Sequence, residues 1–143
     1  MSALTAPTDT AAPVVAGVKV LVIDDSNTIR RSAEIFLAQG GHQVMLAEDG
    51  FDALSKVNDH APELIFCDIL MPRLDGYQTC AIIKRNPKFA HVPVIMLSSK
   101  DGLFDKARGR MVGSEDYLTK PFTKEQLLRA VLQFRPARGD ATI

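Results

Sequence analysis

Five short apolar runs alternate with five segments of helical periodicity between residues 18 and 134, and this alternation constrains the fold more than any other feature of the chain. The first run, Val18–Ile23, is rich in β-branched residues and is followed at once by acids, which is typical of a strand that is buried on both faces. Strand–helix units of this length connect through right-handed crossovers. The sequence therefore predicts an α/β fold, a doubly wound (βα)5 domain with a parallel sheet and helices on both faces.

The residues that end each segment place the other elements. A Gly-Gly pair stops the first helix, and prolines bar the continuation of the second and third helices. Thr123, with Gln126 three positions later, is typical of a capping box at the start of the last helix. The later strands are expected over Gln43–Ala47, Leu64–Cys67, Val94–Leu97 and Asp116–Thr119, and the third and fourth helices over Asp75–Arg85 and Leu103–Val112.

The two ends of the chain differ from this domain in composition. Residues 1–17 are rich in Ala, Thr and Pro, and residues 135–143 contain Pro136 and Gly139. Neither segment can bury enough apolar surface to offset the entropy lost on ordering. We expect disordered tails at 1–17 and 135–143 around one domain at 18–134, with no room for an attached helix-turn-helix or another output domain.

Charge and hydropathy exclude several function classes. The 17 Lys and Arg residues balance 17 Asp and Glu residues, so no net charge favours direct binding of nucleic acid. No apolar run approaches the roughly 18–20 residues that span a bilayer, and the N-terminus lacks the basic and apolar regions of a signal peptide. Cys67 and Cys80 lack the spacing of a zinc site and are expected to be reduced thiols. The expected location is the cytoplasm, without membrane insertion.

Polar and charged side chains follow four of the expected strands. Asp24 and Asp25 follow the first strand, Asp68 the third, Ser98 the fourth and Lys120 the fifth. Taken singly, an acidic pair can begin a helix, a serine can cap one and a Lys-Pro pair can form a turn. Ligands of doubly wound sheets, however, bind beyond the carboxyl ends of the strands, where these groups would converge. Such a group of like charges is unfavourable unless a cation compensates it.

These residue types match the parts of a phosphoryl-transfer site. Carboxylate oxygens without clustered His or Cys suit Mg²⁺, which uses one or two carboxylates together with a phosphate. A carboxylate can itself be the nucleophile and become an aspartyl phosphate. A metal and a lysine neutralise charge on the transferring group, and a hydroxyl can bind one of its oxygens.

Three runs, in this order, resemble receiver domains of two-component response regulators. They are Val22–Ser26, Cys67–Gly76 and Tyr117–Phe122, and the resemblance extends over nearly all of Val18–Phe134. It implies a flavodoxin-like sheet with strand order 2-1-3-4-5.

The resemblance also implies a phosphoacceptor and a metal site. Asp68 would accept a phosphoryl group from a sensor histidine kinase or its phosphotransfer domain. Asp25, Asp68 and the backbone carbonyl of Leu70 would bind Mg²⁺ directly, and Asp24 would act through a metal-bound water.

A switch is implied as well. Ser98 and Lys120 would bind phosphoryl oxygens, and Tyr117 would turn inward when the hydroxyl engages the phosphate. Ser98 stands where most members of the family carry Thr, but the hydroxyl is kept. The Lys120–Pro121 peptide would be cis, and an output protein would bind the face formed by helix four, strand five and helix five.

A second segment narrows the resemblance. Leu97–Lys106, continued by Gly113–Tyr117, is similar to PilG-type regulators of type IV pilus twitching motility.

Leu70 and Lys100 would lie near the path of the water that hydrolyses the phosphoryl group, where an apolar side chain and a long cation can obstruct it. We therefore hypothesise slow self-dephosphorylation.

The function expected from these features is that of a single-domain response regulator in twitching motility or chemotaxis-like signalling. It would catalyse only its own phosphorylation and dephosphorylation, so it would not be an enzyme in the usual sense. Two alternatives remain: a receiver-fold scaffold that works without phosphorylation, and a phosphate sink in another phosphorelay. A scaffold could lose one of the acids, the hydroxyl or the lysine of the site. This chain keeps all of them, which argues against the scaffold. An aspartate-nucleophile phosphatase would need a DxDxT motif, which Asp24–Thr28 does not supply.

Overall fold

A computed structural model describes residues 17–99 and 105–136 of the chain. The expected tails at 1–17 and 135–143 lie almost wholly outside these described residues, so their disorder stays a prediction. Helices and strands alternate along the described part: β2 (Lys19–Ile23), α2 (Asn27–Gln39), β3 (Gln43–Ala47), α3 (Gly50–His60), β4 (Leu64–Asp68), α4 (Gly76–Arg85), β5 (Val94–Ser99), α5 (Lys106–Val112), β6 (Asp116–Lys120) and α6 (Lys124–Phe134).

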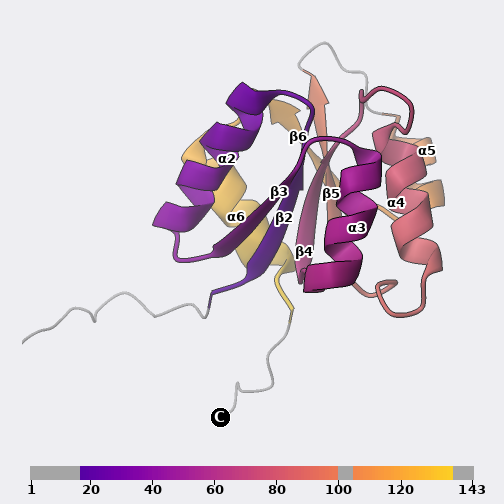
Figure 1. Ribbon diagram of the computed structural model, residues 1–143. Coiled ribbons are helices and arrows are strands. Elements are labelled where there is room, and N and C mark those ends of the chain that lie inside the picture. Colours follow the sequence, from indigo (N-terminus) through magenta and orange to yellow (C-terminus); the bar gives the residue numbers. More distant parts are fainter. Residues whose placement is uncertain (1–16, 100–104, 137–143) are drawn as a thin grey trace, which may run out of the picture.

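The five strands form one parallel sheet in the order β3-β2-β4-β5-β6. Numbered by their sequence, this is the order 2-1-3-4-5, as expected. Helices α2 and α6 cover one face of the sheet, and α3, α4 and α5 cover the other (Figure 1). The doubly wound fold is therefore confirmed, and the carboxyl ends of β2, β4, β5 and β6 meet at one edge.

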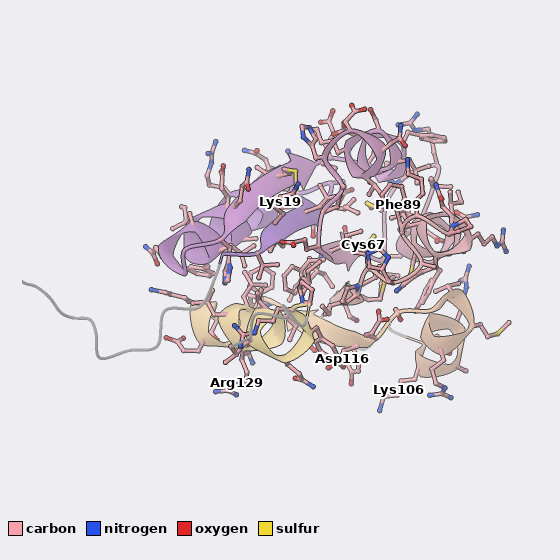
Figure 2. All side chains as sticks on the ribbon, turned by 90° about the horizontal axis from the view of Figure 1, so that it is seen from below. Lys19, Cys67, Phe89, Lys106, Asp116 and Arg129 are labelled. Atoms are coloured by element: carbon pink, nitrogen blue, oxygen red, sulfur yellow. The ribbon has the colours of Figure 1, made fainter. Side chains whose placement is uncertain are left out.

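Both faces of the sheet are packed, which explains why the strands are apolar at consecutive positions. Strand β4 is buried along its whole length, with alternate residues facing opposite helical layers. One core contains Phe66 and Leu97 with side chains of α2 and α6, and the other contains Cys67 and Met96 with side chains of α3 and α4. Figure 2 shows Cys67 inside the molecule and Lys106 and Arg129 at its periphery.

Each helix begins at a residue whose side chain accepts a hydrogen bond from the first turn. The caps are Ser26, Asp49, Asp75, Asp105 and Thr123. The capping box of Thr123 and Gln126 is confirmed. Ser26, Asp49 and Thr123 closely follow the ends of β2, β3 and β6, so these caps fix the short connections at the carboxyl edge of the sheet.

Most boundaries lie within one residue of the expected ones. Helix α5 begins at Lys106, where the Asp105 side chain caps it by accepting a hydrogen bond from the backbone N–H of Arg108, and the expected start near Leu103 lies outside the described residues. Strand β5 continues past Leu97 to Ser99, because its last two residues pair with β6. Among the described residues, no helix is long and apolar enough to cross a membrane.

Candidate functional site

The carboxyl edge of the sheet brings a lysine between two buried acids. The Nζ atom of Lys120, the last residue of β6, lies 2.9 Å from Asp68 Oδ1 and 3.1 Å from Asp24 Oδ2. Asp24 follows β2 and is 0% exposed, and Asp68 ends β4 and is 3% exposed. Asp24 is held further by the backbone N–H of Ser26, which donates to its Oδ1 at 2.9 Å. Three strands that are distant in the sequence therefore supply one compact charged cluster.

Asp25 completes a group of three carboxylates. One oxygen atom from each of Asp24, Asp25 and Asp68 lies within 4.8 Å of the others, and Asp25 is the exposed member. Hard oxygen donors at this spacing, open to solvent on one side, fit Mg²⁺, which retains several waters. The donor set of this chain therefore fits the expected metal.

The electrostatics of the cluster are unbalanced. Burial, followed by the negative charge of Asp24, raises the pKa of Asp68 to about 7, although Lys120 opposes this shift. Burial alone would lower the pKa of Lys120, but its hydrogen bond to Asp68 and the charges of both acids outweigh burial and raise that pKa above its ordinary value. One ammonium group thus faces two nearly inaccessible carboxylates, and a divalent cation would compensate the remaining charge.

A small cavity of about 110 Å³ opens beside Asp68. Asp25 and Lys120 form its polar walls, and Leu70 stands at its side with 59% of its surface exposed. The cavity has room for a small polar group directly against the Asp68 carboxylate. Its other lining residues are Ile69, Leu97 and Ser99.

The two serines at the end of β5 differ in their surroundings. Ser98 is 2% exposed, and its hydroxyl donates to the backbone carbonyl of Ser99 at 3.2 Å. Ser99, and not Ser98, lines the cavity, where it pairs in register with Lys120. The role of Ser98 toward a phosphoryl group stays a prediction. Ser99 was not among the expected site residues, although its place directly after the apolar run is a signal that it reaches the site.

Tyr117 lies on β6, is half-buried, and packs against the core on the side of α3 and α4. The Nζ atom of Lys106 on α5 is 5.9 Å from the centroid of its ring, a distance that allows a cation–π contact. The Lys120–Pro121 peptide beyond it is cis, as expected. The inward turn of Tyr117 stays a prediction.

Gly76, at the end of the loop that follows Asp68, lies against the backbone of Asp68 and Ile69. The backbone N–H of Gly76 donates to the carbonyl of Ile69 at 2.8 Å. A Cβ atom on Gly76 would lie only 2.2 Å from the backbone oxygen of Asp68. Glycine is therefore required here by close approach, and the start of α4 packs directly against the backbone of the central acid.

Comparisons with known proteins agree with this geometry. The family described as "Response regulator receiver domain" matches residues 20–132. Protein PilG of Pseudomonas aeruginosa is 64% identical over 121 residues, which cover 85% of this chain and 90% of PilG. Protein PilH of the same organism is 35% identical over 79% of this chain and 93% of its own length. Some other relatives are longer: the chain spans about half, 45%, of the probable transcriptional regulator ycf27 of Guillardia theta.

Solved structures show the same architecture. The chemotaxis protein CheY4 of Vibrio cholerae superposes with a TM-score of 0.79 and 31% sequence identity. The match covers 83% of this chain and 99% of CheY4. The similarity therefore extends over the whole sheet and its helices.

Proposed function

The chain belongs to the response regulator receiver domain family, and on that premise we propose that it is a single-domain response regulator whose Asp68 accepts a phosphoryl group. The donor would be a sensor histidine kinase or its phosphotransfer domain. The observation that carries this proposal is the contact of Lys120 with both Asp68 and Asp24 beside a cavity that reaches the Asp68 carboxylate. Proteins of this family are signalling proteins and not conventional enzymes.

The metal site would be formed by residues around the same cavity. Asp25, Asp68 and the backbone carbonyl of Leu70 would hold Mg²⁺ directly, and Asp24 would act through a water molecule. When bound, the ion would neutralise charge on the transferring phosphoryl group. The exposure of Asp25 and the burial of Asp24 support this division of roles.

The side chains of this protein would carry the transfer itself. An oxygen of Asp68 forms a bond to phosphorus while the bond from phosphorus to the imidazole nitrogen of the donor breaks, and the imidazole keeps the electron pair. Lys120 moves from neutralising the carboxylate to neutralising a phosphoryl oxygen without leaving the cluster. Ser98 gives up its hydrogen bond to the Ser99 carbonyl and donates to another phosphoryl oxygen.

The output would be a protein contact in the cytoplasm. The face formed by α5, β6 and α6 is the proposed binding surface, and Met111 on α5 is an apolar side chain with 85% exposure. The high identity to PilG supports a role in type IV pilus twitching motility or chemotaxis-like signalling. The alternatives are a scaffold that is never phosphorylated and a phosphate sink, which is phosphorylated but binds no output protein.

The test is Mg²⁺-dependent labelling with acetyl phosphate, followed by intact mass measurement. The wild type should gain one phosphoryl adduct in Mg²⁺ and none with a chelator. Asp68→Asn should gain none, whereas Asp59→Asn, which changes an exposed acid on α3, should behave like the wild type. The absence of an adduct in the wild type would favour the scaffold, and an adduct that persists in Asp68→Asn would mean that another residue is the phosphoacceptor.

A further inference from the structure

The loop between β4 and α4 turns at Arg73 in a conformation that is rare for a residue other than glycine. The φ angle of Arg73 is 70°, and across it the backbone N–H of Leu74 donates to the carbonyl of Pro72 at 2.8 Å. A hydrogen bond between residues two positions apart, around a positive φ, is the mark of a strained γ-turn. Such strain persists only where the surrounding structure holds the backbone in place.

The Arg73 side chain fastens this turn to the start of α3. Its Nη2 atom lies 3.0 Å from Oδ2 of Asp49, and its Cζ atom lies 5.1 Å from the centroid of the Phe51 ring. Asp49 is the N-cap residue of α3, and its other carboxylate oxygen accepts a hydrogen bond from the backbone N–H of Asp52 at 2.7 Å. The helix start therefore fixes both partners of the arginine. We call Asp49, Phe51 and Arg73 the Arg73 clamp.

The clamped turn belongs to the same closed loop as the backbone carbonyl of Leu70. The backbone N–H of Gly76 donates to the carbonyl of Ile69 at 2.8 Å, which closes residues 70–75 at their base. The Leu70 side chain is 59% exposed, so it does little to anchor its own peptide group. In a loop with fixed ends, a change of the dihedral angles at the turn requires compensating changes elsewhere in the loop. The conformation of Arg73 and the direction of the Leu70 carbonyl are therefore linked.

We propose that Arg73 is a positioning residue of the metal site, and that the Arg73 clamp keeps the Leu70 carbonyl turned toward Asp25 and Asp68. This inference rests on the function proposed above, in which that carbonyl holds Mg²⁺. The apparent dissociation constant of a ligand rises as the binding-competent fraction of the protein falls. Loosening the clamp therefore weakens Mg²⁺ binding, although Arg73 itself does not touch the ion.

The experiment observes the Leu70 carbonyl directly by NMR. Leu70–Met71 is the one Leu-Met pair in the sequence. Protein labelled with carbonyl-¹³C leucine and ¹⁵N methionine therefore gives a single correlated signal, which comes from the peptide group that joins these two residues. Titration with Mg²⁺ should shift this signal in the wild type, and the concentration dependence of the shift gives the dissociation constant.

Arg73→Gly is the most informative variant, because glycine adopts a positive φ without strain. Its metal-free stability, measured by urea unfolding in a chelator, should fall less than that of Arg73→Ala, which loses the same contacts but keeps the strain. The Mg²⁺ dissociation constant should nevertheless rise about three- to ten-fold, within the range that one exposed cation–π contact and one exposed ion pair can supply. Removal of a positive charge would by itself strengthen the binding of a dication, so charge alone predicts the opposite sign.

Arg31→Ala is the matched control. It removes an exposed arginine whose ion pair with Glu34 is also 3.0 Å long, but this arginine lies on α2 and outside the clamp. Its Mg²⁺ affinity should equal or exceed that of the wild type. Asp49→Asn keeps a good N-cap but loses the ion pair with Arg73, so it should raise the dissociation constant by a smaller factor than Arg73→Gly. It also serves as the test if the glycine variant folds poorly.

The outcomes separate the clamp from the proposed function. If the wild type binds Mg²⁺ and both Arg73→Gly and Asp49→Asn bind it as tightly, the clamp is overturned while the proposed function stands. A fall in affinity that Arg31→Ala shares also overturns the clamp, as does a Leu70–Met71 signal that stays in place when Mg²⁺ supports labelling of Asp68. If the wild type neither binds Mg²⁺ nor gains a phosphoryl adduct, the proposed function fails, and the clamp fails with it.

Discussion

The ammonium nitrogen of Lys120 lies 2.9 Å from a carboxylate oxygen of Asp68, although 52 positions separate the two residues in the chain. The pairing of β6 with β5, and of β5 with β4, creates this contact. Because Asp24 shares the same ammonium group, one cation serves two buried acids. The stability of the protein should therefore respond to every change that alters this balance.

Asp68→Asn should stabilise the metal-free protein at pH 8 by on the order of 1–3 kcal/mol. The folded-state pKa of about 7 lies well above the ordinary value for an aspartate, so ionised Asp68 costs stability above pH 7. That cost should shrink as the pH falls from about 7 toward 4, because the folded state takes up a proton that the unfolded state does not. Urea unfolding at several pH values in a chelator measures the difference.

The control for this pH dependence is Asp59→Asn, which alters an exposed acid and should change stability little at any pH. An advantage of Asp68→Asn that grows on acidification would contradict the assigned direction of the pKa shift.

Mg²⁺ should raise the unfolding temperature of the wild type, and Asp25→Asn should remove most of this effect. At ten times the dissociation constant, binding adds about 1.4 kcal/mol to stability. Asp25 is exposed, so its replacement should leave the metal-free stability almost unchanged. Thermal unfolding with Mg²⁺ and with a chelator gives both quantities. An equal Mg²⁺ shift in Asp25→Asn would mean that this carboxylate is not a ligand.

Gly76→Ala should destabilise the fold by more than about 2 kcal/mol, although alanine is the better helix former. The added methyl group would meet the Asp68 backbone oxygen at 2.2 Å, and backbone atoms cannot yield easily. Gly40→Ala is the matched control, because its methyl group would meet side-chain atoms and no backbone, namely the flexible end of Leu128 at 2.5 Å and the ring of His42 at 3.3 Å. Denaturant unfolding compares the two, and similar costs would argue against the special role of Gly76.

Leu70→Asn should shorten the lifetime of the phosphorylated protein several-fold. Leu70 lines the cavity with most of its side chain exposed, and an amide there can orient a water molecule that an isobutyl group excludes. The decay of the phosphorylated mass after removal of the donor measures this rate. Ile82→Asn, a similar change at an exposed position on α4, should leave the rate unaltered. The companion residue of the hypothesis, Lys100, lies outside the described residues.

Much of the fold and site was predictable because both depend on local patterns. Acids that directly follow apolar runs located the ends of β2 and β4, and the pair of Thr123 and Gln126 located the cap of α6. The end of β5 was placed too early, since the apolar-run criterion misses the polar Ser98 and Ser99, which are in the strand because β6 pairs with them.

The remaining features depend on contacts between distant residues. The Ser98 hydroxyl donates to the carbonyl of Ser99 because of the rotamer that its side chain adopts. The pattern of residue types along the chain does not predict a rotamer. The stacking of Arg108 on Tyr77 joins two helices across 31 positions, and neither residue carries a local signal of the other. The nearly complete burial of Asp24 likewise follows from packing around Lys120 and not from the acidic pair itself.

The span of 96 positions between Asp24 and Lys120 has a consequence for the newly made chain. Synthesis from the N-terminus produces both acids well before the last strand that carries their cation. A chain that ends before β6 would bury two carboxylates without the lysine, a costly arrangement in a nonpolar interior. Completion of the final strand therefore determines when the acidic cluster can close, so that unfinished or truncated chains do not contain an assembled site.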